Sequence, residues 1–289
     1  MVSKYIYTKV YIIGSGQLAF ACAEIVKKYI SNIKVFELKV TESTVLEKLC
    51  GKNEIPYQMI SSKELTQILM SEEESALIVS AASIYLVPET VIKKKNFLII
   101  NWHNALLPKH KGRNAEVWAI YNGDDVTGVT WHLITKDIDA GAIIRQEMIS
   151  IDEKTTAMSL YREQMALGEK MFCEFCEAML KDQYKTEPQK IESDSQIHYS
   201  KDVPNNGVLD LDWEIEKILC FLRCMDYGSL LLMGKMKLIY SGVQYEFYRY
   251  NIKYADEYQM KRAIMMEDGR LTIKENNTVI IMKGLQEIG

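Results

Sequence analysis

The chain has 289 residues, of which 48% are hydrophobic and 26% are charged, and this globular composition excludes an intrinsically disordered chain. Its formal net charge is −4, so it lacks the excess of basic residues that marks a general nucleic-acid-binding protein. No stretch approaches the roughly 18 consecutive apolar residues of a membrane-spanning helix.

Strand-like and helix-like runs alternate through the first part of the chain. Residues 9–13 are β-branched and aromatic and predict a strand, and a glycine turn then leads into a helix that ends near Ile30. Further strands are predicted at 35–40, 76–81, 97–102, 128–134 and 142–149, and further helices at 43–50, 60–70, 87–93 and 156–181. This alternation predicts an α/β fold, Rossmann-like, with an open and largely parallel sheet.

The pattern changes after residue 184. Residues 185–197 are polar, contain Pro188 and predict a linker. Beyond it we predict one helix at 213–225 and short strands at 235–241, 245–250, 262–266, 271–274 and 278–283. We therefore expect an α/β domain over residues 1–184 and a small, mostly β domain over residues 198–289, arranged as a partly open, OB-like barrel.

The six cysteines include two close pairs that could be taken for a metal site. Cys173 and Cys176 lie in one predicted helix, and Cys220 and Cys224 lie in another. At these spacings the thiols extend apolar stripes, whereas zinc knuckles usually place such pairs on turns. We interpret them as reduced core cysteines and expect no metal. Since the polar start of the chain does not resemble a signal peptide, we also expect a cytoplasmic protein.

A glycine-rich turn, Gly14-x-Gly16-x-x-Ala19, follows the first predicted strand. It is typical of dinucleotide-binding proteins, and Glu37 lies near the position of the acidic residue that binds a ribose. The same glycines are needed wherever a strand-to-helix turn packs tightly. A nicotinamide-dependent oxidoreductase, a packing turn and an anion site at the helix start all stay open.

The residues best suited to catalysis lie between positions 99 and 146. Asn101 and His103 end a predicted buried strand two positions apart, so their side chains project to the same side, at the sheet edge where such folds build sites. An amide beside an imidazole suits a reaction that forms an oxyanion and moves a proton. Asp139 lies in a loop, before a glycine that lets backbone approach a ligand. Purely structural roles for all three residues remain an alternative.

Three blocks in this region resemble the signature of the folate-dependent formyltransferases. They are Asn101-Trp102-His103-Asn104-Ala105-Leu106-Leu107-Pro108, Thr127-Gly128-Val129-Thr130-Trp131-His132 and Asp139-Ala140-Gly141. Their order and the seven-residue step from His132 to Asp139 are those of the family, although Asn104-Ala105 departs from its usual Pro-Ser or Gly-Ser. The resemblance covers residues 10–151 and continues faintly at 211–213.

The resemblance implies an N-formyltransferase that uses 10-formyltetrahydrofolate as donor and no metal. Asn101, His103 and Asp139 would be catalytic, and His132 would orient Asp139. Asp139 would favour a protonated, charged His103 and would hold a water that relays protons. The donor's pterin would lie against Ser83, Ile84, Tyr85 and Leu86, and against Ile134, Asp137 and Asp139.

A basic loop follows the first block and is the candidate acceptor site. Lys109, Lys111 and Arg113 could bind a phosphate or a carboxylate, although a solvated turn has the same composition. Residues 195–289 carry twelve Lys and Arg against thirteen Asp and Glu, which is too neutral for a tRNA clamp. We therefore favour the amine of a nucleotide-linked sugar, such as a CMP-linked acid sugar of the pseudaminic type, over methionyl-tRNA, and expect no nucleic-acid or membrane partner.

The remaining polar and aromatic residues are assigned more ordinary roles. We interpret His110 and His198 as surface residues. The tyrosines of the C-terminal strands could stack a base or sugar, or could form core or the face of a homodimer; they are Tyr240, Tyr245, Tyr248, Tyr250 and Tyr254.

Overall fold

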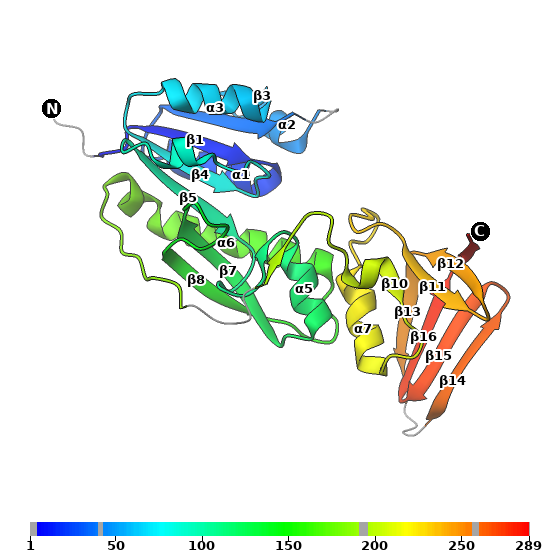
Figure 1. The fold of residues 1–289 in the computed structure, drawn as a ribbon. Helices are drawn as coiled ribbons and strands as arrows, with labels where there is room; N and C mark the ends of the chain where they lie inside the picture. The colour runs from blue at the N-terminus through cyan, green and yellow to red at the C-terminus, as the bar shows by residue number, and fades with distance from the viewer. Residues whose placement is uncertain (1–4, 40–42, 191–195, 256–259, 289) are drawn as a thin grey trace. The chain divides into compact units, whose positions relative to one another are not determined.

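The computed structural model describes residues 5–39, 43–190, 196–255 and 260–288 (Figure 1). The chain divides into two compact units. The first comprises Met1–Ala115, Thr127–Ser150 and Arg162–His198, and the second comprises Glu116–Val126, Ile151–Tyr161 and Tyr199–Gly289. These bounds differ from the sequence-based division, because the described part of the predicted linker belongs to the first unit. The assignment of catalysis to residues 1–184 stays a prediction.

The first unit contains a seven-stranded sheet of order β3-β2-β1-β4-β5-β7-β8 (Figure 1). Its strands are β1 (Lys9–Gly14), β2 (Ile33–Leu38), β3 (Tyr57–Ile60), β4 (Ala76–Ala81), β5 (Phe97–His103), β7 (Val126–Leu133) and β8 (Ile143–Ser150). The first five pair in parallel, and β7 pairs antiparallel with β5. The predicted Rossmann-like, largely parallel sheet is confirmed. Strand β3 was not predicted, because only Ile60 of its four residues is buried.

The helices are α1 (Gly16–Lys27), α2 (Val45–Lys52), α3 (Ser62–Ser71), α4 (Glu89–Ile92), α5 (Ala115–Asn122) and α6 (Ala157–Leu180). Helix α3 shows how local sequence sets a boundary. The Ser61 hydroxyl accepts the Glu64 N–H, and the Glu64 carboxylate accepts the Ser61 N–H, so two donors of the first turn are satisfied. Leu65 and Leu69, one helical turn apart, are fully buried in a cluster with Phe36 of β2.

Gly14 ends β1 at a point where no side chain fits. A Cβ at this position would lie 1.9 Å from the Ala81 carbonyl oxygen of β4. Gly14→Ala is therefore expected to lower the free energy of unfolding by about 1–3 kcal/mol through overpacking. Gly51→Ala is the matched control, because a Cβ on α2 there meets nothing within 4 Å and should stabilise the helix. Urea denaturation of both variants tests this; equal stabilities would contradict it.

The second unit is mostly β, as predicted. One sheet contains β10 (Val208–Leu209), β11 (Met236–Tyr240), β12 (Val243–Phe247) and β17 (Gln286–Glu287), and the other contains β13 (Arg249–Tyr254), β16 (Thr278–Lys283), β15 (Arg270–Asn276) and β14 (Met260–Glu267). Helix α7 (Ile215–Cys224) and a 3-10 turn (Pro204–Gly207) precede β11. The two separate sheets differ from the single barrel that we expected. The predicted strand 245–250 breaks at Tyr248, and its two parts join different sheets.

The cysteines only partly follow the sequence-based interpretation. Cys176 and Cys224 are buried, but Cys173 on α6 is exposed, so the core interpretation is wrong for that residue. Within the described ranges, no group of three or more His, Cys, Asp or Glu side chains is arranged to hold a metal ion. Among the helices of that same part of the chain, none has the length and apolar character needed to cross a membrane.

Candidate active site

Strands β5 and β7 bring the side chains of Asn101, His103 and His132 together. Asn101 of β5 lies opposite His132 of β7 in the antiparallel register, and His103 lies opposite Thr130. The Asn101 amide nitrogen is 3.1 Å from His132 Nε2. His132 therefore contacts Asn101 directly, which the sequence did not predict.

Asp139 reaches these residues because the loop after β7 doubles back. The backbone of Asp139 has a φ of +47°, a conformation that few residues other than glycine adopt. A Cβ on Gly141 would lie 1.7 Å from the Leu133 carbonyl oxygen, so the chain can return past β7 only with glycine there. We expected Gly141 to give a ligand close access; the close approach is instead to Leu133 of the same chain.

The Asp139 carboxylate lies between two imidazoles. Its Oδ1 is 3.4 Å from His132 Nε2, and its Oδ2 is 3.4 Å from His103 Nδ1. The Gly112 N–H donates to Oδ2 at 2.7 Å. The three side chains predicted to be catalytic thus converge, with His132 between Asn101 and Asp139.

The hydrogen-bond partners indicate which ring nitrogens carry hydrogen. His103 Nε2 is 2.9 Å from the His110 carbonyl oxygen, and His132 Nδ1 is 2.9 Å from the Leu133 carbonyl oxygen. A carbonyl oxygen only accepts, so both of these nitrogens must donate. His132 Nε2 is then free to accept from the amide of Asn101, which fixes the orientation of that amide. His103 Nδ1 is left facing Asp139.

Burial sets the charge of His103 in the free protein. His103 is 3% exposed, and this burial lowers its pKa below the ordinary 6.5, although the neighbouring Asp139 acts in the opposite direction. Asp139 favours the protonated ring, as expected, but burial is the larger influence on this pKa. Burial tends to raise the pKa of Asp139, but the neighbouring imidazoles of His103 and His132 and the Gly112 N–H outweigh it, and the pKa lies well below its usual range.

We expect His103 to titrate below pH 6.5 in the free protein. Asp139→Asn removes the largest influence that raises this pKa, so His103 should titrate at still lower pH in that variant. Because the folded-state pKa lies below the unfolded one, His103 should also make the protein less stable as the pH drops below about 6.5. NMR titration of the imidazole carbons measures this, and a midpoint above 6.5 would contradict it.

The basic loop contains short strand β6 (Lys111–Gly112), which pairs in parallel with β9 (Ile197–His198). Lys109 is exposed, Lys111 is half-buried, and an Arg113 guanidinium nitrogen is 3.2 Å from the Ser83 carbonyl oxygen. His110 and His198 are buried, and their rings stack with centroids 5.8 Å apart. The interpretation of both histidines as surface residues is wrong, because β9 packs onto this loop.

The two segments predicted to bind the donor meet in one hydrophobic cluster. Tyr85 is buried in it, and Ile134 packs against it. Ile84 and Leu86 are 61% and 78% exposed, and Ile138, beside the exposed Asp137, is 38% exposed. Both loops therefore present apolar side chains to solvent, as a flat aromatic ligand would require. Contact of these residues with a donor remains a prediction.

A family model for formyl transferases matches residues 21–175, which is more than half of the chain. The chain belongs to the formyl transferase family. The matched span includes Asn101, His103, His132 and Asp139, the four residues whose side chains converge.

Three known proteins are similar to this chain. GDP-perosamine N-formyltransferase of Brucella melitensis is 34% identical over 141 residues, 48% of this chain and 52% of that protein. Methionyl-tRNA formyltransferase of Lactobacillus acidophilus is 24% identical over 237 residues, 81% of this chain and 72% of that one. An N-formyltransferase from Helicobacter canadensis, solved with folinic acid and dTDP-3-aminofucose, has a TM-score of 0.73 at 19% identity and covers 97% of this chain and 99% of that chain.

The chain spans about half the length of the Brucella relative that it matches. At 19% identity, the likeness to the solved structure concerns the fold alone.

The surroundings of Glu37 do not support the dinucleotide interpretation of the glycine turn. Glu37 is 5% exposed, and its carboxylate accepts hydrogen bonds from Thr44 at 2.6 Å and from Tyr57 at 2.8 Å. A buried carboxylate with these partners is not presented to a ribose. Gly14 serves close packing against β4, as described above.

Proposed function

We propose that this chain transfers a formyl group from 10-formyltetrahydrofolate to the primary amine of a nucleotide-linked sugar. The observation that carries the proposal is the convergence of Asn101 and His103 from β5 with Asp139 from a loop, and with His132 Nε2 of β7 close to both the amide and the carboxylate. Membership of the formyl transferase family supports the reaction. The first unit is the catalytic one.

In the proposed reaction, Asn101 stabilises the oxyanion, and His103 and Asp139 together carry the proton. The amine nitrogen forms a bond to the formyl carbon, and the carbonyl oxygen becomes an oxyanion. The Asn101 amide donates one hydrogen to His132 and has its second for this oxyanion. The ionised Asp139 and the bare Nδ1 of His103 take up the proton that the amine loses. His103 thus becomes positively charged when the oxyanion is present.

The second half of the reaction returns that proton. As the oxyanion collapses, the bond between the formyl carbon and the folate N10 breaks, and N10 takes the proton from the His103–Asp139 pair. The products are tetrahydrofolate and the formamide of the sugar. No electrons are exchanged, and the two side chains finish in their starting protonation states.

The choice of acceptor and donor rests on chemistry and on the relatives. The Brucella relative is a GDP-perosamine N-formyltransferase, and the Helicobacter structure holds a folate and a dTDP-linked amino sugar. Lys109, Lys111 and Arg113 supply cations for the phosphates of such an acceptor. The exposed apolar residues Ile84 and Leu86 suit the pterin of the donor.

A screen of acceptors tests this function. The protein would be incubated with 10-formyltetrahydrofolate and with amino sugars linked to GDP, dTDP, UDP or CMP, and the products would be read by mass spectrometry. We expect at least one acceptor to gain one formyl group. Protection of the fold by NADPH but not by a folate, with no formylated product, would favour an oxidoreductase and overturn the proposal. Formate release alone would identify a hydrolase.

Methionyl-tRNA formyltransferase is the second candidate. It is favoured by the match to the Lactobacillus enzyme, which extends over 81% of this chain. The nearly neutral charge of residues 195–289 opposes it. A gel-shift with initiator tRNA at moderate salt distinguishes the two, because tight binding would reverse our preference.

We further propose a cytoplasmic homodimer. All six cysteines are free thiols, which supports a reducing compartment. Tyr248 and Tyr254 are 42% and 49% exposed, and they support a contact face on the second unit. Light scattering of the purified protein measures the dimer.

A further inference from the structure

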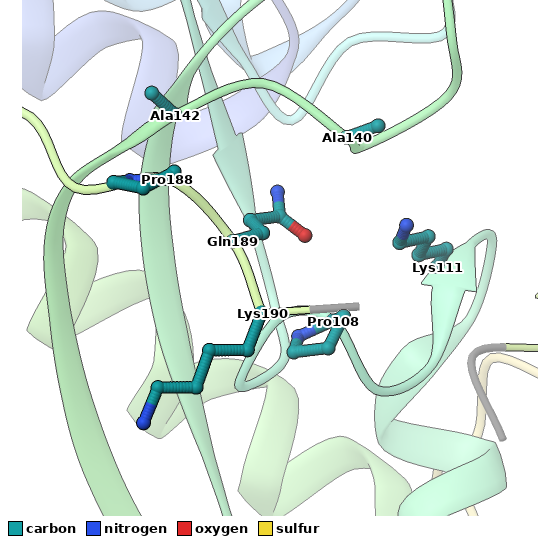
Figure 2. A pocket seen from close by; sticks show the side chains of 7 residues that line it. All are labelled: Pro108, Lys111, Ala140, Ala142, Pro188, Gln189 and Lys190. Carbon is teal, nitrogen blue, oxygen red and sulfur yellow. The ribbon is translucent and has the colours of Figure 1, made fainter. Parts of the chain in front are cut away.

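A cavity of about 380 Å³ lies in the first unit, beside the loop that carries Asp139. Its lining residues include Lys111 of β6, Ala140, and Gln189 and Lys190 of the segment predicted to be a linker (Figure 2). Lys111 immediately precedes Gly112, whose N–H holds the Asp139 carboxylate. The walls of this cavity are therefore the same loops that position the proposed catalytic base.

Gln189 connects the linker segment to the catalytic loop. Its amide nitrogen donates at 2.8 Å to the Asp139 carbonyl oxygen and at 2.8 Å to the Gly141 carbonyl oxygen. Both partners are carbonyl oxygens, so the nitrogen of this amide must face them. Glu187 adds two backbone hydrogen bonds to Ile143, at 2.7 and 2.8 Å, on the far side of the loop. The linker segment thereby fixes the position of the Asp139 loop.

Among the described residues, the amide oxygen of Gln189 has no hydrogen-bond partner. It is buried, and no group among the residues with described positions donates a hydrogen bond to it. Figure 2 shows this oxygen turned toward the side of the cavity on which Lys111 lies. A buried acceptor that lacks a donor is unusual in a folded protein, and it marks the place where a ligand N–H or O–H would complete the hydrogen bonding.

The charge around the cavity points to an anion. Neither Lys111 nor Lys190 forms an ion pair with any residue in the described ranges, and no Asp or Glu side chain lines the cavity. Pro108, Ala142 and Pro188 supply apolar walls. An anionic group would pair with the Lys111 ammonium, and a hydrogen-bond donor next to that group would reach the amide oxygen of Gln189.

We propose that this cavity binds the anionic arm of one of the two co-substrates, and that Gln189 accepts a hydrogen bond from that arm while holding the Asp139 loop. The proposal rests on the proposed function. Two sources carry the required chemistry: a sugar hydroxyl beside a diphosphate on the acceptor, and the amide N–H beside the carboxylates of the glutamate on the donor. Gln189 is thus a positioning residue, and Lys111 is the anion contact.

Binding measurements on the full chain test this proposal and separate the two sources. Isothermal titration calorimetry would use GDP-mannose, dTDP-glucose and UDP-glucose, which cannot react, and 5-formyltetrahydrofolate with and without its glutamate. We expect Gln189→Leu and Lys111→Ala each to weaken binding of the same probe class by about 5–20-fold. Gln183→Leu and Lys185→Ala are the matched controls, because both residues are exposed. Binding of every probe within about twofold of wild type in both test variants would overturn the proposal.

Steady-state kinetics then separate the positioning role of Gln189 from the anion contact of Lys111. Gln189→Leu removes both the acceptor and the donor of this amide, so the KM of the affected substrate should rise about 5–20-fold and kcat should fall, because the Asp139 loop loses its support. Lys111→Ala removes only the anion contact, so its KM should rise with kcat nearly unchanged. KM values equal to that of the wild type in both variants would contradict the proposal. Failure of the proposed function would instead appear as no transfer by the wild-type protein, whatever the probes show.

Discussion

Replacing Asp139 by Asn is expected to lower kcat for formyl transfer by about 10²–10⁴-fold, because the variant loses the carboxylate that shares the proton of the attacking amine with His103. The substitution keeps the shape of the side chain, and its amide oxygen can still accept the Gly112 N–H that now lies 2.7 Å from Oδ2. We therefore expect the melting temperature to change little. Steady-state assays by mass spectrometry, together with thermal unfolding followed by circular dichroism, measure both quantities.

The control for this variant is Asp152→Asn. Asp152 is an exposed carboxylate in a turn of the second unit, where it accepts hydrogen bonds from Thr155 and Lys154. It is not one of the residues that converge at the candidate site, so the kcat of this variant should equal that of the wild type. A kcat near the wild-type value for Asp139→Asn would show that this carboxylate takes no part in the proton transfer.

Replacing His103 by Asn is expected to have an effect of the same size, a loss of about 10²–10⁴-fold in kcat. The imidazole lies against Asp139 Oδ2 at 3.4 Å, and it is the group that becomes charged beside the oxyanion. Asparagine is smaller and cannot carry that proton. The KM values should change less than kcat, because this interaction develops only as the reaction proceeds.

The pH dependence distinguishes this role of His103 from a structural one. In the wild-type protein kcat should fall at acid pH, when His103 is protonated before the amine attacks and can no longer accept a proton. In His103→Asn that decline should disappear, and the pH dependence of the remaining slow reaction should reflect only the other titratable groups. An unchanged acid limb in the variant would assign the decline to another residue.

The part of the site that the sequence predicts well depends on local geometry. Asn101 and His103 lie two apart on a strand, and this spacing alone places their side chains on one side of β5. The buried runs of β1, β4 and β5 likewise predict a sheet without any further information.

The part that was missed depends on contacts between segments far apart in the chain. The direction of β7 cannot be read from its own residues, so the pairing of Asn101 with His132 was not foreseen. The basic composition around Lys111 resembles a solvated turn, and only the pairing of β6 with β9 buries His110 and His198. Gln189 lies in a polar stretch that has no signal of its own.

The direction in which the pKa of His103 shifts was likewise not predictable from the sequence. The neighbouring carboxylate could be inferred from the resemblance, and it favours the protonated ring. The depth of the site could not be inferred, and burial outweighs the carboxylate. The sign of the net effect therefore required the structure.

A double-mutant cycle on His103→Asn and Asp139→Asn, measured as kcat for formyl transfer to the best acceptor, tests the central claim most directly. If the imidazole and the carboxylate handle one proton together, the double variant should be about as slow as either single variant. If the two losses multiply, the residues act independently, and the shared-proton mechanism is wrong.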